Sequence, residues 1–127
     1  GAFMDGFTNL EVAALRAIFS ETPELAPALK RQLDGSVVTD RENSGGGFFT
    51  TIAVADDAPT VNSPSVLGYD THARIGGLEH GFGFVLFMKD GRLHMLEGFA
   101  WAPESTHGLD LTALQFEIYN QPEPRRS

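Results

Sequence analysis

FVLFMKDGRLHMLEGF occupies residues 84–99 and contains the strongest structural signal in the chain. Asp90 and Gly91 separate two apolar runs, and an Asp-Gly pair in that setting is typical of a two-residue β-hairpin turn. Counting away from this turn gives the residues that should face one another across the hairpin. The predicted pairs are Met88 with Leu93, Leu86 with Met95, Phe84 with Glu97, and Phe82 with Phe99.

This pairing predicts a hairpin face that is apolar apart from Glu97, and we expect that face to pack against helices. Its other members are Phe82, Phe84, Leu86, Met88, Leu93, Met95 and Phe99. An unpaired carboxylate there would cost on the order of several kcal/mol. Glu97 is therefore either a structural residue that pairs with Arg41, Arg74 or a backbone N–H, or a carboxyl with a raised pKa that acts in proton transfer or ligand binding. The third alternative is that the hairpin has a different register.

The opposite hairpin face is half polar, but it brings Val85, Phe87 and Leu96 together, with His94 at the border. Two helices are too few to cover both faces of a sheet. An uncovered apolar patch of this kind commonly marks an interface. We therefore expect these residues to contact a second copy of the chain or another protein partner.

Helix and strand signals surround the hairpin. Thr8 and Glu11 have capping-box spacing before an apolar segment that ends at Phe19, which predicts the first helix. A second helix is indicated by an apolar stripe that ends before Gly35, and its members are Leu25, Leu29 and Leu33. Alternating segments, typical of strands, occupy residues 36–42, 48–54, 69–75 and 113–119. The predicted fold is α+β, with two N-terminal helices packed on one antiparallel sheet of about five strands.

Domain organisation and composition limit the classes of function. The 127 residues are the length of one domain, with termini expected to fray over 1–6 and 120–127. A formal net charge of −8 and the lack of a basic stripe argue against nucleic acid and anionic membrane surfaces as partners. The chain has no cysteine, apolar runs are too short to span a bilayer, and no signal peptide is visible. We expect a cytoplasmic protein.

Few residues have the spacing of a chemical site. A ligand pocket around Glu97 would take Arg41, His72 and Asp70 as further binding residues. A metal site could be built from Asp70, His72, Glu79 and His80, but Asp-x-His-x-Arg is equally typical of a solvated strand face, and no helical zinc spacing occurs. We expect no metal, no cofactor and no catalytic residue.

Two runs, TDRENSGGGFFT (39–50) and GFGFVLFMKDGRLHMLEGF (81–99), resemble a family of small bacterial α+β proteins without assigned function. The shared features are a Gly-rich strand start and a hydrophobic hairpin that ends in Leu96-Glu97-Gly98. The resemblance implies a fold but no catalytic residue. In size and charge the chain is also similar to immunity or antitoxin-like proteins. These signals favour a non-enzymatic protein-interaction module, and the alternative is a small-molecule binder or weak enzyme with a pocket around Glu97.

Overall fold

The computed structural model describes residues 6–120, which form two helices and one antiparallel sheet. The helices are α1 (Asn9–Ser20) and α2 (Ala26–Asp34). The strands are β1 (Ser36–Asn43), β2 (Gly47–Val54), β3 (Val66–Leu67), β4 (Thr71–Ile75), β5 (Phe82–Lys89), β6 (Arg92–Ala100) and β7 (Phe116–Asn120). The strand order is β1-β2-β6-β5-β4-β7, and β3 also pairs with β5. The α+β class is confirmed, but the sheet has seven strands rather than about five.

One of the seven, β3, lies outside the segments for which the sequence predicts a strand. Residues 1–5 and 121–127, most of the segments expected to fray, lie outside the described residues. Asn120 was also expected to fray, but it pairs with Thr71 at the end of β7. The Gly6 carbonyl likewise has a partner, because it accepts a hydrogen bond from Arg41 at 2.7 Å.

Helix α1 begins, and helix α2 ends, where the sequence indicates. The Thr8 side chain accepts from the Glu11 N–H at 3.1 Å, and the Glu11 carboxylate accepts from the Thr8 N–H at 2.8 Å. This capping box satisfies two N–H groups that a helix start leaves without partners. In α2, Pro27 lies in the first turn, where its missing N–H costs nothing, and Gly35 caps the C-terminus.

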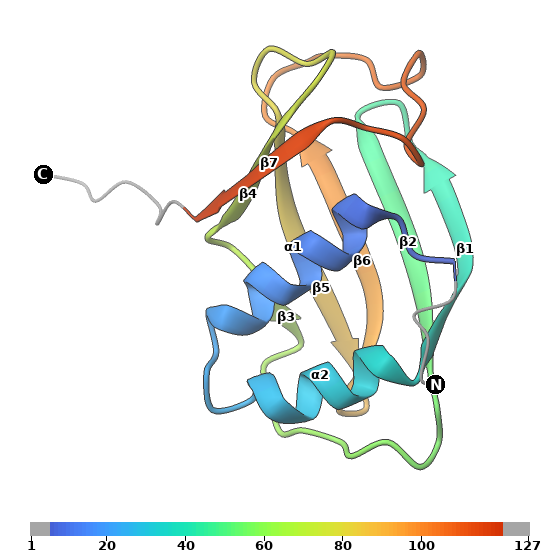
Figure 1. The fold of residues 1–127 in the computed structure, drawn as a ribbon, viewed down its shortest axis with the longest axis vertical. Helices are drawn as coiled ribbons and strands as arrows, with labels where there is room; N and C mark the ends of the chain where they lie inside the picture. The colour runs from blue at the N-terminus through green and yellow to red at the C-terminus, as the bar shows by residue number, and fades with distance from the viewer. Residues whose placement is uncertain (1–5, 121–127) are drawn as a thin grey trace, which may run out of the picture.

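The two helices cover the same face of the sheet (Figure 1). We call this the inner face, and its strand residues pack with the helices in one core. The largest fully buried side chains of this face are Phe48, Phe82, Phe84, Leu86 and Leu96. Within residues 6–120 no helix lies on the opposite side, which we call the outer face.

The hairpin turn is as predicted, but the register beyond it is not. Asp90 and Gly91 have φ of 53° and 76°, the pair of positive values that a type I′ turn requires. Lys89 pairs with Arg92 and Met88 with Leu93. The next pair is Phe87 with Met95, so His94 is the extra residue of a β-bulge. A bulge places two residues opposite one and reverses the face of every later side chain in that strand.

The bulge corrects the face assignment of β6. Glu97 pairs with Val85 and Phe84 pairs with Gly98, so Glu97 and Phe84 lie on opposite faces. Leu96 is 0% exposed in the core rather than on the uncovered face. By the same shift Met95 and Phe99, expected in the core, lie on the outer face.

Two glycines allow aromatic rings to lie flat on these central strands. A Cβ at Gly98 would lie 2.3 Å from the ring of Phe48 on the inner face. A Cβ at Gly83 would lie 2.6 Å from the ring of Phe99 on the outer face. A larger residue at either position would displace the ring that covers it. The glycine of the Leu96-Glu97-Gly98 tripeptide therefore has a packing role.

The Gln32 side chain links the hairpin to α2 and to the loop that contains Pro59. Its side chain is 0% exposed, and its amide nitrogen donates to the carbonyls of Pro59 at 2.7 Å and Gly91 at 2.9 Å. Its amide oxygen accepts from the Leu93 N–H at 2.9 Å. Since both ends of the amide are satisfied, a buried polar group stabilises the junction of three segments that are distant in sequence.

Candidate functional site

The outer face carries a continuous patch over its central strands that is apolar except for one glutamate, and we call it the outer patch. It consists of Phe49, Val85, Phe87, Met95, Glu97 and Phe99, all half-buried. The register joins them across three strands, because Glu97 lies between Phe49 on β2 and Val85 on β5. Met95 lies opposite Phe87 in the next row. Apolar side chains thus surround one carboxylate on a face that no helix of the described chain covers.

Glu97 is the carboxylate of the outer patch. Within residues 6–120 no hydrogen bond or ion pair reaches its carboxylate, although Phe49 and Val85 flank it directly across the strands. Partial burial raises the pKa of Glu97, because apolar neighbours disfavour the charged form. The carboxylate is therefore incompletely solvated and uncompensated.

The β1 side of the outer face is acidic. Asp40 lies opposite Thr51 and Glu42 lies opposite Phe49, so both point to the outer face. The ion pairs of the described chain join Arg41 with Glu11, Arg74 with Glu117, and His80 with Glu104. Asp40, Glu42 and Glu97 take part in none of them. This half of the outer face has unbalanced negative charge.

The other end of the outer face is aromatic and polar. The Trp101 indole N–H donates to His72 Nδ1 at 3.2 Å, and the Tyr119 ring stacks on His72 at 5.4 Å between centroids. Trp101 also contacts Phe99 edge-on at 5.0 Å, which links this cluster to the outer patch. Trp101 remains 53% exposed. It lies on the outer face, away from the core.

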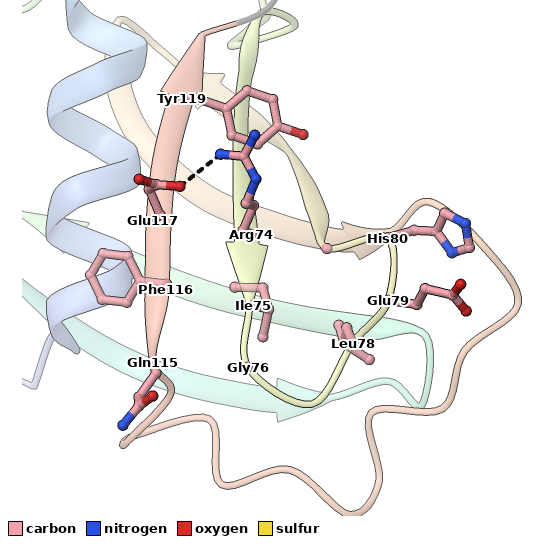
Figure 2. Close-up of a pocket in the computed structure, with 11 residues that line it drawn as sticks. Arg74, Ile75, Gly76, Leu78, Glu79, His80, Gln115, Phe116, Glu117 and Tyr119 are labelled. Atoms are coloured by element: carbon pink, nitrogen blue, oxygen red, sulfur yellow. Dashed lines mark hydrogen bonds and ion pairs between the residues drawn. The ribbon is translucent and has the colours of Figure 1, made fainter.

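A hollow of about 450 Å³ opens beside this cluster, between β4, β7 and the turn at 76–81. Figure 2 shows Arg74 paired with Glu117 at 2.7 Å and lying beside the Tyr119 ring. Both partners of that ion pair are about 70% exposed, so water screens it. A second hollow of about 590 Å³ lies near Glu21 and Tyr69 on the helix side. Neither hollow includes Glu97.

Arg41 serves the inner face instead of a pocket around Glu97. Its guanidinium donates to both carboxylate oxygens of Glu11, at 2.7 and 2.5 Å, and the Thr50 hydroxyl also donates to Glu11. These hydrogen bonds to Glu11 raise the pKa of Arg41 above its ordinary value. Because the sheet separates Arg41 from Glu97, the predicted pairing of these two residues is wrong.

The remaining predicted binding residues do not converge on Glu97 either. His72 lies on the outer face, with β5 between its strand and that of Glu97. The Asp70 N–H donates to the Glu21 carboxylate at 3.3 Å, next to α1. Among residues 6–120 no group of three or more His, Asp or Glu side chains is placed to hold a metal ion. His80 and Glu79, the other members of the metal alternative, instead contact Glu104 through their backbone N–H groups.

Glu104 accepts those N–H groups at 2.7 and 3.0 Å, and they lower the pKa of its carboxyl. Glu104 thus differs from Glu97, because both of its carboxylate oxygens accept hydrogen bonds. The contact ties the 101–115 segment to the turn at 76–81, and we assign it a structural role.

The structure places two of the four predicted interface residues on the outer face. Val85 and Phe87 lie on the outer face as expected, whereas Leu96 is in the core and His94 is the bulge residue. Phe49, Met95 and Phe99 were not predicted to belong to the interface. The signal for Phe49 was present, because consecutive Phe48 and Phe49 in a strand must point to opposite faces.

Neither helix of the described residues is long and apolar enough to cross a membrane. The chain matches no known family, no curated protein and no solved structure. The resemblance to small bacterial proteins without assigned function stays a prediction, and the function has to be argued from the outer face.

Proposed function

We propose that this protein is a non-enzymatic interaction module that binds a basic protein partner on the outer face of its sheet. The observation that carries the proposal is Glu97, a carboxylate with no hydrogen-bond or ion-pair partner within residues 6–120, among apolar side chains on a face that no described helix covers. Interfaces have apolar centres in which aromatic residues and methionine are enriched, and the outer patch has that composition. A partner that covers it would bury the apolar side chains and supply the missing positive charge.

Charge favours a basic partner over a second copy of the chain. A two-fold dimer through this face would apply the same patch twice and bring the acidic side chains Asp40, Glu42 and Glu97 towards their symmetry mates. Each copy also has a net charge of −8, which opposes association. A basic protein would be attracted both by these acidic side chains and by the net negative charge. Long-range attraction would also speed its encounter with the outer face.

Site-specific photocrosslinking tests the proposal. We would replace Phe87 with p-benzoylphenylalanine, and place the same group at Tyr69, which is 68% exposed on the helix side, as the control. A basic protein should crosslink at position 87 and not at position 69. Binding of that purified protein should weaken at least roughly tenfold in Phe87→Asp, which places a charge in the outer patch, and be unchanged in Tyr69→Asp.

Two results would overturn the proposal. One is a crosslinked partner that binds folded Phe87→Asp as tightly as the unaltered protein. The other is a crosslink at position 87 to a second copy, together with a dimer in sedimentation that Phe87→Asp dissociates. Circular dichroism of both variants establishes that loss of binding is not loss of folding.

A further inference from the structure

On the basis of the proposed function, we infer that the partner contributes an arginine whose guanidinium pairs with Glu97 at the centre of the outer patch. Within residues 6–120 no donor occupies either Glu97 oxygen, so both can accept. Arginine alone among the cationic side chains presents two parallel N–H groups that match both oxygens of a carboxylate.

The neighbours of Glu97 also favour a guanidinium over an ammonium. Phe49 lies directly across from Glu97, and Phe99 is the next outer-face residue along β6. A guanidinium is planar and weakly hydrated, so it stacks on aromatic rings and loses little solvation in apolar surroundings. A lysine ammonium is strongly hydrated and would enter the same surroundings at a greater desolvation cost.

Among residues 6–120, the Lys and Arg side chains on strands β4, β5 and β6 are engaged elsewhere or too distant to fill this position. On the outer face Arg74 pairs with Glu117 and lies over the Tyr119 ring at 4.8 Å. The Arg92 guanidinium donates to the Asp56 carbonyl at 3.0 Å. Lys89 lies at the hairpin tip, four residues along β5 from Val85, which is roughly 13 Å in a strand. None of these three side chains supplies the cation, and we therefore assign it to the partner.

Short capped peptides test this inference without a known partner. The probes are acetyl-Leu-Arg-Leu-amide, its lysine analogue, and its citrulline analogue, which keeps the shape of arginine but lacks the charge. Binding is followed by NMR through the Met95 methyl group and the Glu97 side chain. The arginine peptide should shift both signals with a dissociation constant roughly tenfold lower than that of either analogue.

The Glu104 side chain provides an internal control, because backbone N–H groups already occupy its oxygens. Its signals should not respond to any peptide. In Glu97→Gln the preference for arginine over citrulline should disappear while the Met95 methyl signal reports an intact face. Equal affinity for the three peptides, or the absence of any shift at Glu97, would overturn the inference.

Failure of the inference and failure of the proposed function give different results. If a basic protein crosslinks at position 87 but the peptides do not discriminate at Glu97, the outer face binds a protein without this arginine contact. If no basic protein crosslinks at position 87, the proposed function itself is lost, whatever the peptides do.

Discussion

The inner and outer faces of the sheet each place a glutamate among apolar side chains, and they treat it differently. On the inner face Glu11, which is 1% exposed, accepts hydrogen bonds from Arg41, Thr50 and the Thr8 backbone. On the outer face Glu97 has no donor within residues 6–120. The inner face is electrostatically complete without any other molecule, whereas the outer face is not.

The difference follows from what covers each face. Helix α1 carries Glu11 onto the sheet, where Arg41 and Thr50 lie side by side on β1 and β2. A buried charge is tolerated in a core only when such partners are built in. Glu97 keeps part of its hydration because its face is open, so the fold tolerates it without a partner. Full coverage of the outer face would remove that hydration and create the need for a cation.

The largest expected effect comes from removing the contact between Arg41 and Glu11 on the inner face. Arg41→Ala leaves the Glu11 carboxylate buried without its main partner, and it should lower the free energy of unfolding by about 3–5 kcal/mol. Urea denaturation measures the loss. Arg74→Ala is the matched control, because it removes an arginine from an exposed ion pair and should cost no more than about 1 kcal/mol. Equal losses in the two variants would show that the inner pair is not a buried one.

A second prediction tests the assignment of the two faces at adjacent residues. Leu96→Ala removes a side chain that is 0% exposed and should cost about 2–5 kcal/mol. Glu97→Ala removes an unpaired carboxylate from the outer face and should change stability by no more than roughly 0.5 kcal/mol. The measurement is again chemical denaturation. The reverse order of effects would restore the register without a bulge.

The smallest expected effect is the pH dependence of Glu97. Burial raises its pKa in the folded state, so the folded protein holds this proton more tightly than the unfolded chain does. The Glu97 contribution to stability is therefore present at low pH and is lost as the pH rises through the raised pKa. Glu97→Gln lacks that loss. Relative to the unaltered protein, it should gain stability as the pH rises from below the ordinary pKa of glutamate to above the raised one, by less than roughly 1 kcal/mol for a partly solvated group.

Unfolding curves of both proteins at a series of pH values measure this difference, in which the other titrating groups cancel. A difference that is constant across the series, or one that grows towards low pH, would contradict a raised pKa at Glu97.

The sequence predicted the elements better than the faces. The capping box at Thr8 and Glu11, the second helix ending at Gly35, and the Asp90-Gly91 turn have strong local signals, and the structure confirms all of them. These features depend on hydrogen bonds and backbone angles of neighbouring residues. That is the range over which residue type alone determines the conformation.

The hairpin register was wrong because its hydrophobic pattern fits both alternatives. With or without an extra residue at His94, each face of β6 receives at least one large apolar side chain. Alternation specifies a register only where one face is polar. The choice is made by distant contacts, above all the fit of Leu96 beneath the helices and of the Phe48 ring over Gly98. A local pattern contains neither contact.

The error in the hairpin register also affected the predicted site. Glu97 was recognised as unusual, but its expected companion Arg41 belongs to the opposite face. The role of Arg41 is set by Glu11, which a capping box already explained and which therefore raised no question. A residue that satisfies one local rule can have a second, tertiary partner, and only the fold brings the two together.

The amide of Gln32 has a consequence for recognition. By joining α2 to the loop at Pro59 and to the hairpin at Gly91 and Leu93, it holds the strands that carry the outer patch in one conformation. A ligand that docks on such a preorganised surface immobilises few additional groups, so little conformational entropy is lost on association. A modest contact area on these strands can therefore sustain a stable complex.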